Sequence, residues 1–222
     1  MEELIIPAGG RPLPVALHLR RDDAAMVVFV HGSGLDRHDC RTATLAGLLY
    51  DSGYSTAAID LLDEQEVRER HNVFDVELQG ERLDAALAWL REHFPMPIGL
   101  FGAGVGAGVA LVTAAHAEPR ARAVVCCNGR PDTASAHLQA VTVPTLLIVA
   151  ELDPWNELAL ERLGGEKALQ VVPRPSALFG GEELKNIADL ACGWFGRHLK
   201  PSSGKTDERE DRLPEHRPQR HA

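Results

Sequence analysis

The chain has 222 residues, of which 45% are hydrophobic and 25% are charged, and its formal net charge at pH 7 is -9. This length suits one domain, and the composition excludes a disordered, collagen-like or disulfide-scaffold protein. A negative net charge disfavours nonspecific attraction to nucleic acid or to an anionic membrane, because both are negatively charged themselves. We therefore expect a small-molecule ligand or a protein partner, with no nucleic acid and no membrane.

The first seven residues, MEELIIP, contain no basic segment and no long apolar run, so we expect no secretion signal. No stretch of the sequence reaches the length of a membrane span. Its cysteines, Cys40, Cys126, Cys127 and Cys192, show no C-x-x-C spacing. These features together predict a cytoplasmic protein with free thiols.

Apolar runs bounded by turn residues alternate with helical patterns from about residue 24 onward. This order predicts an α/β protein with a mostly parallel sheet and helices on both faces. Six strands are predicted at residues 26–31, 55–61, 97–102, 121–127, 144–150 and 167–173. Residues 4–7 and 13–19 flank Gly9-Gly10, a pair suited to positive φ, so an antiparallel hairpin should edge the sheet. The expected total is about eight strands.

Two helices are predicted from their apolar spacing. After Phe74, leucines recur at helical intervals at positions 78, 83, 87 and 90, and a last helix is expected over residues 182–198. That helix should end before Pro201 and close a domain of residues 1–199. Residues 200–222 have mixed charge and almost no apolar side chain, so we predict a disordered charged tail.

Two glycine-rich corners follow predicted strands. The sequence HGSG stands at residues 31–34 and GAGVG at residues 102–106, each ahead of a predicted helix. In α/β-hydrolases a loop of the first kind contributes an N–H to the oxyanion hole. A G-x-S-x-G turn of the second kind carries the nucleophile at a strained strand-to-helix elbow. Both corners therefore suggest this fold.

From about residue 26 to residue 199 the chain resembles the small, lidless dienelactone-hydrolase-like branch of the α/β-hydrolase superfamily. The resemblance rests on "VVFVHGSGLDRHDCR", "IGLFGAGVGAGVALVTAA", "NGRPD" and "PTLLIVAELDPWNEL". It implies a sheet of about eight strands without a lid domain. It also implies a ligand-binding or oxyanion-binding role for Gly32, Ser33 and Val105. Relatives of this branch are sometimes joined to phosphoribosyltransferase domains, so the resemblance also implies a partner enzyme.

The catalytic triad of the resembled branch is incomplete in this chain. Gly104 occupies the elbow position that holds serine or cysteine in relatives, and glycine has no atom for covalent attack. Asp153, in "Glu151-Leu152-Asp153-Pro154", stands at the position of the triad acid. Ala177 replaces the expected histidine, and the next histidine is His198, deep in the last predicted helix.

Glycine at the elbow has a physical rationale. The central elbow residue adopts a backbone region that costs a non-glycine residue on the order of 1–3 kcal/mol, whereas glycine visits positive φ freely. We expect Gly104 to relax this turn. Such a change is what drift toward stability produces once catalysis is no longer needed.

The elbow sequence admits two other interpretations. Residues 102–107 also match G-x-G-x-x-A, a dinucleotide fingerprint, but the acidic residue expected about 20 positions later is absent, because Cys126-Cys127-Asn128 stands there. Close packing of helix on strand explains the same small residues. The N–H groups of Val105 and Gly106 form a candidate anion site, and a water-filled remnant of an oxyanion hole is the alternative.

The sequence gives weaker evidence for a catalytic or metal-binding role of other reactive side chains. Cys127 and its neighbour Cys126 end a predicted strand, but not the nucleophile strand, so core packing competes with a thiol nucleophile. The densest group of potential metal ligands comprises His31, Asp36, His38, Asp39 and Cys40, for which anchoring of the loop is the simpler explanation. Arg130 and Asp132 fit either the pocket mouth or a salt-bridged turn. We predict no metal and no cofactor.

The resulting hypothesis is a catalytically degenerate, dienelactone-hydrolase-like protein that binds a small ligand or a protein partner at the old active-site face. The alternative is a hydrolase of small esters or lactones that works without a triad, using Asp153 with Ser33 or Cys127.

Overall fold

A computed structural model describes residues 1–8, 10–20, 25–31, 37–116, 120–173 and 181–199. The strands are β1 (Glu2–Ala8), β2 (Arg11–His18), β3 (Met26–Val30), β4 (Ser55–Ile59), β5 (Ile98–Ala103), β6 (Ala123–Cys127), β7 (Thr145–Val149) and β8 (Lys167–Val171). The α-helices are α1 (Cys40–Asp51), α2 (Arg70–Phe74), α3 (Val76–His93), α4 (Val105–Ala114), α5 (Pro154–Arg162) and α6 (Gly181–His198). Short 3-10 turns are η1 (Glu66–Arg68), η2 (Pro131–Ala134) and η3 (Leu138–Ala140).

All eight strands form one open sheet in the order β1-β2-β4-β3-β5-β6-β7-β8. β1 and β2 form the predicted antiparallel hairpin, and β2 is also antiparallel to β4. From β4 to β8 every neighbouring pair is parallel. Gly10, in the hairpin turn, has the positive φ (80°) that its sequence predicts. The predicted α/β class and strand number are therefore confirmed.

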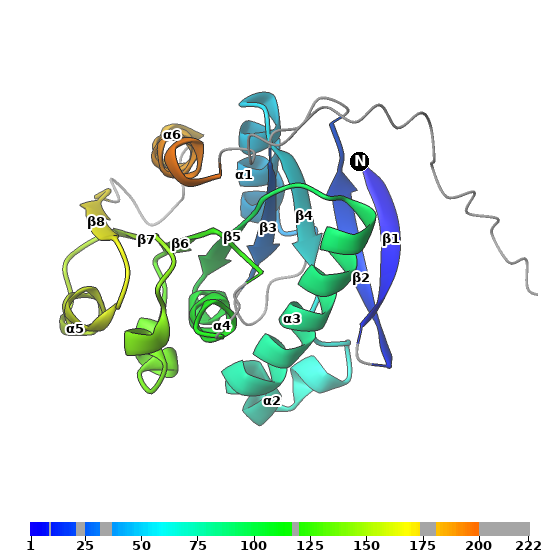
Figure 1. The fold of residues 1–222 in the computed structure, drawn as a ribbon, viewed down its shortest axis with the longest axis horizontal. Coiled ribbons are helices and arrows are strands. Elements are labelled where there is room, and N and C mark those ends of the chain that lie inside the picture. The colour runs from blue at the N-terminus through cyan, green and yellow to red at the C-terminus, as the bar shows by residue number, and fades with distance from the viewer. Residues whose placement is uncertain (9, 21–24, 32–36, 117–119, 174–180, 200–222) are drawn as a thin grey trace, which may run out of the picture.

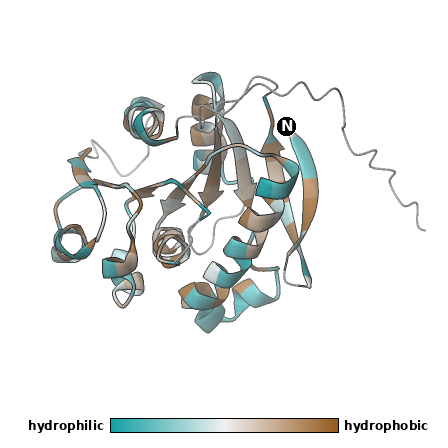
Figure 2. Cartoon of the chain, in the orientation of Figure 1, coloured by the Kyte–Doolittle hydropathy of each residue, from teal (hydrophilic) through white to brown (hydrophobic). Residues whose placement is uncertain are grey.

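Helices cover both faces of the sheet (Figure 1). α1 and α6 lie on one face, where they bury a cluster that includes Phe29, Phe101 and Phe195. α3, α4 and α5 lie on the other face, over a cluster that includes Leu83 and Leu100. The central strands are buried on both faces, which explains why their sequences are continuous apolar runs rather than alternating ones. Figure 2 shows the same pattern, with hydrophobic strands and more hydrophilic outward helix surfaces.

Element boundaries differ from the prediction by a few residues. β8 ends at Val171 rather than at residue 173, β6 begins at Ala123, and α6 begins at Gly181. The short helix α2 was not predicted, because its sequence RHNVF buries only one side chain and has no apolar period. The described residues form no separate lid domain, and none of their helices is long and apolar enough to cross a membrane. The predicted disordered tail lies outside the described residues.

Helix α3 buries the predicted leucine face, except that Gln79 is buried in place of Leu78. Leu83, Leu87 and Leu90 are fully buried, whereas Leu78 is only partly buried. Gln79 takes the buried place instead, and its amide donates to the backbone carbonyls of Asn72 and Val73, at 2.9 and 3.1 Å. A buried polar side chain is tolerated here because its donors are satisfied.

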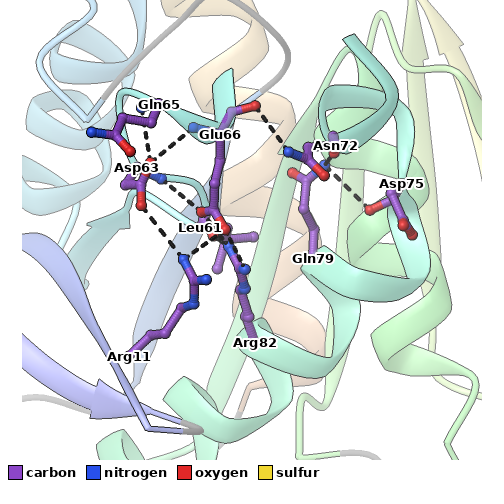
Figure 3. Close-up of polar contacts among 9 residues, drawn as sticks. All are labelled: Arg11, Leu61, Asp63, Gln65, Glu66, Asn72, Asp75, Gln79 and Arg82. Atoms are coloured by element: carbon purple, nitrogen blue, oxygen red, sulfur yellow. Dashed lines mark hydrogen bonds and ion pairs between the residues drawn. The ribbon is translucent and has the colours of Figure 1, made fainter. Parts of the chain in front are cut away.

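The connection from β4 to α3 is fastened by an ion-pair network (Figure 3). The Glu66 carboxylate accepts from both terminal nitrogens of Arg82 on α3, each at 2.8 Å, and from Arg11 on β2 at 2.7 Å. The Arg82 guanidinium also donates to the Leu61 carbonyl at 2.7 Å. These contacts tie the segment that carries α2 to the hairpin and to the sheet-packed helix.

This network should make stability depend on pH below about 4.5. The hydrogen bonds from Arg82 lower the pKa of Glu66 to about 2. A lowered folded-state pKa means that the stabilisation is fully present above the unfolded-state pKa and is lost as the pH falls toward 2. We predict that Glu66→Gln lowers the free energy of unfolding by about 1–2 kcal/mol at pH 7, allowing for solvent screening, and that this difference disappears near pH 2.

Denaturant unfolding across this pH range measures the effect. The matched control is Glu64→Gln, since Glu64 is exposed and forms no ion pair with any described residue. A Glu66→Gln penalty that is independent of pH would contradict the ion-pair account.

Candidate functional site

The turn from β5 to α4 has the backbone geometry of a nucleophile elbow. Gly104 precedes the first residue of α4 with φ 58° and ψ −125°, so the predicted positive φ is confirmed. The Gly104 N–H donates to the Cys127 carbonyl at 3.4 Å, and its own carbonyl accepts from the Arg130 N–H at 2.9 Å. The elbow is thus held by the segment that follows β6.

The glycines beside Gly104 are required by close packing. A Cβ on Gly102 would lie 2.6 Å from the Gly106 carbonyl oxygen, and a Cβ on Gly106 would lie 2.2 Å from the Val30 carbonyl oxygen. On Gly108 it would lie 1.9 Å from the Thr133 hydroxyl. The approach of α4 to β3, β5 and η2 therefore accounts for the glycine spacing without a dinucleotide.

A crevice of about 530 Å³ opens at this elbow. Its walls come from the ends of β3, β5 and β6 and from the starts of α1 and α6, with Phe74 of α2 at one side. The described lining residues are Phe29, Val30, His31, Asp39, Arg41, Thr42, Leu45, Phe74, Phe101, Ala103, Gly104, Val105, Cys127, Asn128, Arg130, Leu184 and Ile187. This position, at the carboxyl ends of parallel strands, is where ligands bind in open α/β sheets.

The oxyanion-side residues are only partly described. Val105 begins α4 and lines the crevice, so its N–H belongs to the first helical turn, whose N–H groups have no partner inside the helix. Gly32 and Ser33, predicted to contribute from the other side, lie outside the described residues. The assignment of an oxyanion hole stays a prediction.

Asp153 is used as a helix cap. One carboxylate oxygen accepts from the N–H groups of Trp155 and Asn156, both at 2.9 Å, and the other accepts from the Asn156 amide at 2.7 Å. These bonds begin helix α5, which is an ordinary structural role for aspartate. Asp153 is not among the described residues that line the crevice. Its role as a retained triad acid stays a prediction.

Ala177, at the predicted histidine position, lies outside the described residues. His198, the next histidine along the chain, is far from the elbow in the fold. Its Nε2 lies 3.6 Å from a carboxylate oxygen of Glu166, which directly precedes β8, at the opposite edge of the sheet from the carboxyl ends. His198 therefore does not supply a base to the crevice.

Asp60 is a partly buried residue beside His31 that the sequence analysis did not identify. Its carboxylate lies 3.0 Å from Nε2 of His31 and accepts from the Arg37 backbone N–H at 2.8 Å and from the Arg37 guanidinium. Burial alone would raise the pKa of Asp60, but the bonds from His31 and Arg37 outweigh it, so the pKa is lowered. The available signal was an acidic residue directly after the buried run of residues 55–59.

Arg37 also donates to Glu3 at 2.9 Å, so this one side chain links β1 to the end of β4. Asp39 caps α1, and Cys40 is exposed. Among the described residues no group of three His, Cys, Asp or Glu side chains is placed to hold a metal ion.

The remaining candidate side chains divide between core and rim. Burial raises the pKa of the Cys126 thiol far above its usual range, so Cys126 is core. Cys127 is 7% exposed and lines the crevice. Arg130 forms two bonds to the Asp132 carboxylate, at 2.8 and 2.7 Å, which confirms the predicted salt-bridged turn at the crevice rim.

A larger hollow of about 1040 Å³ lies between the β1–β2 hairpin and the β4–α3 connection. Two of its carboxylates are paired with arginines, Asp60 with Arg37 and Glu66 with Arg82, and neither Gly104 nor Val105 is among its described lining residues. We therefore place the candidate site at the elbow crevice, where the turn at Gly104 and the first turn of α4 meet the carboxyl ends of the strands.

Comparison with solved structures agrees with this geometry. A dienelactone hydrolase from Anabaena variabilis ATCC 29413 superposes with a TM-score of 0.83 at 38% sequence identity, covering 90% of this chain and 99% of that one. The esterase domain of a Rhodothermus marinus protein superposes with a TM-score of 0.72 at 15% identity, which shows the shared fold alone. No protein-family model matches the chain. The chain belongs to the α/β-hydrolase superfamily, in the dienelactone hydrolase family.

Curated relatives are longer. A Mycobacterium tuberculosis protein named "Putative phosphoribosyl transferase Rv0571c" is 43% identical over 210 residues, and the same match occurs in the corresponding protein of strain CDC 1551 / Oshkosh. The match covers 89% of this chain and 46% of the relative, so the chain spans about half the length of these relatives.

The elbow glycines should rank by stability cost when changed to alanine. Gly104→Ala forces a side chain into positive φ and should lower the free energy of unfolding by about 1–3 kcal/mol. Gly106→Ala drives a Cβ into the Val30 carbonyl and should cost more, about 3 kcal/mol. Gly47→Ala in α1 meets no atom within 4 Å and should be neutral or stabilising.

Thermal and denaturant unfolding of the three variants measures the loss of stability in each and so tests this ranking. If Gly104→Ala were as harmless as Gly47→Ala, the elbow would not have the conformation described.

Proposed function

We propose that this protein is a catalytically degenerate member of the dienelactone hydrolase family that binds a small ligand or a protein partner at the old active-site face. The observation that carries the proposal is the elbow at Gly104, which keeps the nucleophile turn at the start of α4 but has no side chain to attack a substrate. Ala177 at the histidine position removes the general base from the same triad.

The retained features support binding rather than covalent chemistry. The crevice keeps an apolar wall formed by Phe29, Leu45 and Phe101 and the N–H groups at the start of α4. Removing triad members from a hydrolase leaves roughly 10³–10⁴-fold acceleration over water from binding and oxyanion stabilisation. Weak residual ester hydrolysis is compatible with the proposal, whereas burst kinetics from an acyl-enzyme is not.

If the bound partner is a protein, we propose that it is an enzyme. The Mycobacterium tuberculosis relatives carry about as much additional sequence as the matched part, and their name describes a phosphoribosyl transferase. We propose that a phosphoribosyl transferase, whether on the same chain or a separate one, is the protein that this domain accompanies.

The direct test is esterase activity with p-nitrophenyl acetate. We expect the wild-type protein to show no burst and a kcat/KM at least about 10³-fold below that of an ordinary esterase, since the nucleophile and base are missing. The double change Gly104→Ser with Ala177→His should raise this activity, and Asp153→Asn should abolish the gain. Ordinary esterase turnover by the wild type, abolished by changing Asp153 alone, would refute the proposal.

A second candidate function is hydrolysis without a triad, and one observation favours it. Cys127 lies at the crevice rather than wholly in the core, and its carbonyl accepts from the elbow N–H of Gly104. Asp153 is engaged in capping α5, and Ser33 lies outside the described residues. Iodoacetamide labelling decides the matter: rapid alkylation of Cys127 that parallels loss of hydrolysis supports this candidate, and slow alkylation like that of buried Cys126 opposes it.

A further inference from the structure

Asn128, the residue directly after β6, has an unusual backbone conformation beside the elbow. Its φ is 43°, and among the residues that the structure describes it is the one residue other than glycine with positive φ. The other described residues with positive φ are Gly10, Gly53 and Gly104, and glycine adopts this region without strain. Asparagine tolerates the same region at some cost, and strained residues concentrate at binding and catalytic sites. The side chain of Asn128 is therefore a candidate for a binding role.

The side-chain amide of Asn128 is fixed in one orientation. Its Oδ1 accepts from the Ala150 backbone N–H at 2.9 Å, and the Asn128 backbone N–H donates to the Ile148 carbonyl at 2.8 Å. Because a backbone N–H can only donate, the amide oxygen must face Ala150 and the amide nitrogen must face the other way. The amide is thus held between the ends of β6 and β7 independently of any ligand.

The nitrogen of this amide lies on the crevice side. Nδ2 lies 3.8 Å from Sγ of Cys127. The Cys127 side chain packs in the same apolar cluster as Phe29 and Phe101. All of these residues, and Asn128 itself, line the crevice. The contact with sulfur therefore places Nδ2 beside the crevice wall.

Nδ2 of Asn128 has more donating capacity than its neighbours use. A primary amide nitrogen carries two N–H groups, and a thiol sulfur is a weak acceptor. Within the part of the chain that the structure describes, Nδ2 forms no hydrogen bond other than the contact with Cys127. At least one N–H group can therefore donate to a ligand that carries a strong acceptor.

The charged groups around the crevice favour an uncharged acceptor. Arg130 donates twice to the Asp132 carboxylate, and Nε of Arg41 lies 3.4 Å from the Asp39 carboxylate. Each arginine thus stands beside a carboxylate, and these carboxylates repel an anionic ligand. Among uncharged carbonyl groups a carboxamide has the strongest acceptor oxygen, because its nitrogen donates electron density to the carbonyl.

We propose that Asn128 is a ligand-recognition residue and that the crevice binds an uncharged carboxamide with an apolar body. The carboxamide oxygen accepts from Nδ2 of Asn128, and the apolar body packs against the wall formed by Phe29, Leu45 and Phe101. The inference rests on the proposed binding function of the crevice and adds the chemical class of the ligand and the residue that selects it.

Titration followed by NMR tests the ligand class with three probes of nearly the same shape: benzamide, benzamidine and benzoate. Benzamide should bind the wild-type protein at least about tenfold more tightly than benzamidine, which has no acceptor for Nδ2, and more tightly than benzoate. Its binding should shift the side-chain NH2 signals of Asn128. Those signals are assigned by their loss in Asn128→Asp.

Asn128→Asp separates recognition from the structural role of the side chain. Aspartate keeps an acceptor for the Ala150 N–H and tolerates positive φ, but it has no N–H group to donate. This variant should keep the melting temperature while it weakens benzamide binding at least about tenfold. It should also bind benzamidine more tightly than the wild type does, because its carboxylate pairs with the amidinium group. Asn186→Asp, the same change at an exposed position of α6, is the matched control and should leave binding unchanged.

Asn128→Gly is the second variant, and it covers the case in which Asn128→Asp does not fold. Glycine adopts positive φ without strain and lacks the donor, so benzamide binding should again fall at least about tenfold. If both variants fold poorly and lose all three probes in parallel, the side chain has a structural role and the inference is wrong.

The remaining outcomes separate this inference from the proposed function. Absence of benzamide binding to the wild type overturns the inference, as does equal benzamide binding by the wild type and Asn128→Asp. If benzoate or benzamidine binds at the crevice in place of benzamide, the ligand class is wrong while the binding function stands. Ordinary esterase turnover with burst kinetics would instead refute the proposed function.

Discussion

The close approach of α4 to the central strands is the constraint on which the rest of the molecule depends. Helix and strands meet with almost no space between them, because Gly102 and Gly106 leave room for backbone against backbone. This contact fixes the start of α4 at the carboxyl ends of β3 and β5. The elbow, the crevice and the bonds from Gly104 to the segment after β6 follow from that position. None of these backbone contacts requires a side chain at position 104.

Glycine at position 104 also suits the backbone conformation of the elbow. An elbow residue with a side chain stores strain at positive φ, and Gly104 releases it. A turn with glycine at its centre suits the proposed binding role of the crevice, because binding needs no attacking side chain at position 104.

Sequence patterns predicted most of the fold, because buried parallel strands and amphipathic helices have strong periodic signals. They also predicted the positive φ of Gly104 and the Arg130–Asp132 turn, since both depend on neighbours in the chain. Asp60 was missed because its contacts with His31 and Arg37 join segments that are distant in the sequence.

The central claim is that no activated nucleophile stands at the elbow. The most direct measurement is intact-protein mass spectrometry after treatment with a fluorophosphonate, which attaches to activated serine nucleophiles. The account predicts an unmodified wild-type protein, and a single adduct at position 104 in the protein carrying Gly104→Ser and Ala177→His. A stoichiometric adduct on the wild-type protein, mapped either to Ser33 or to a residue that lines the crevice, would contradict it.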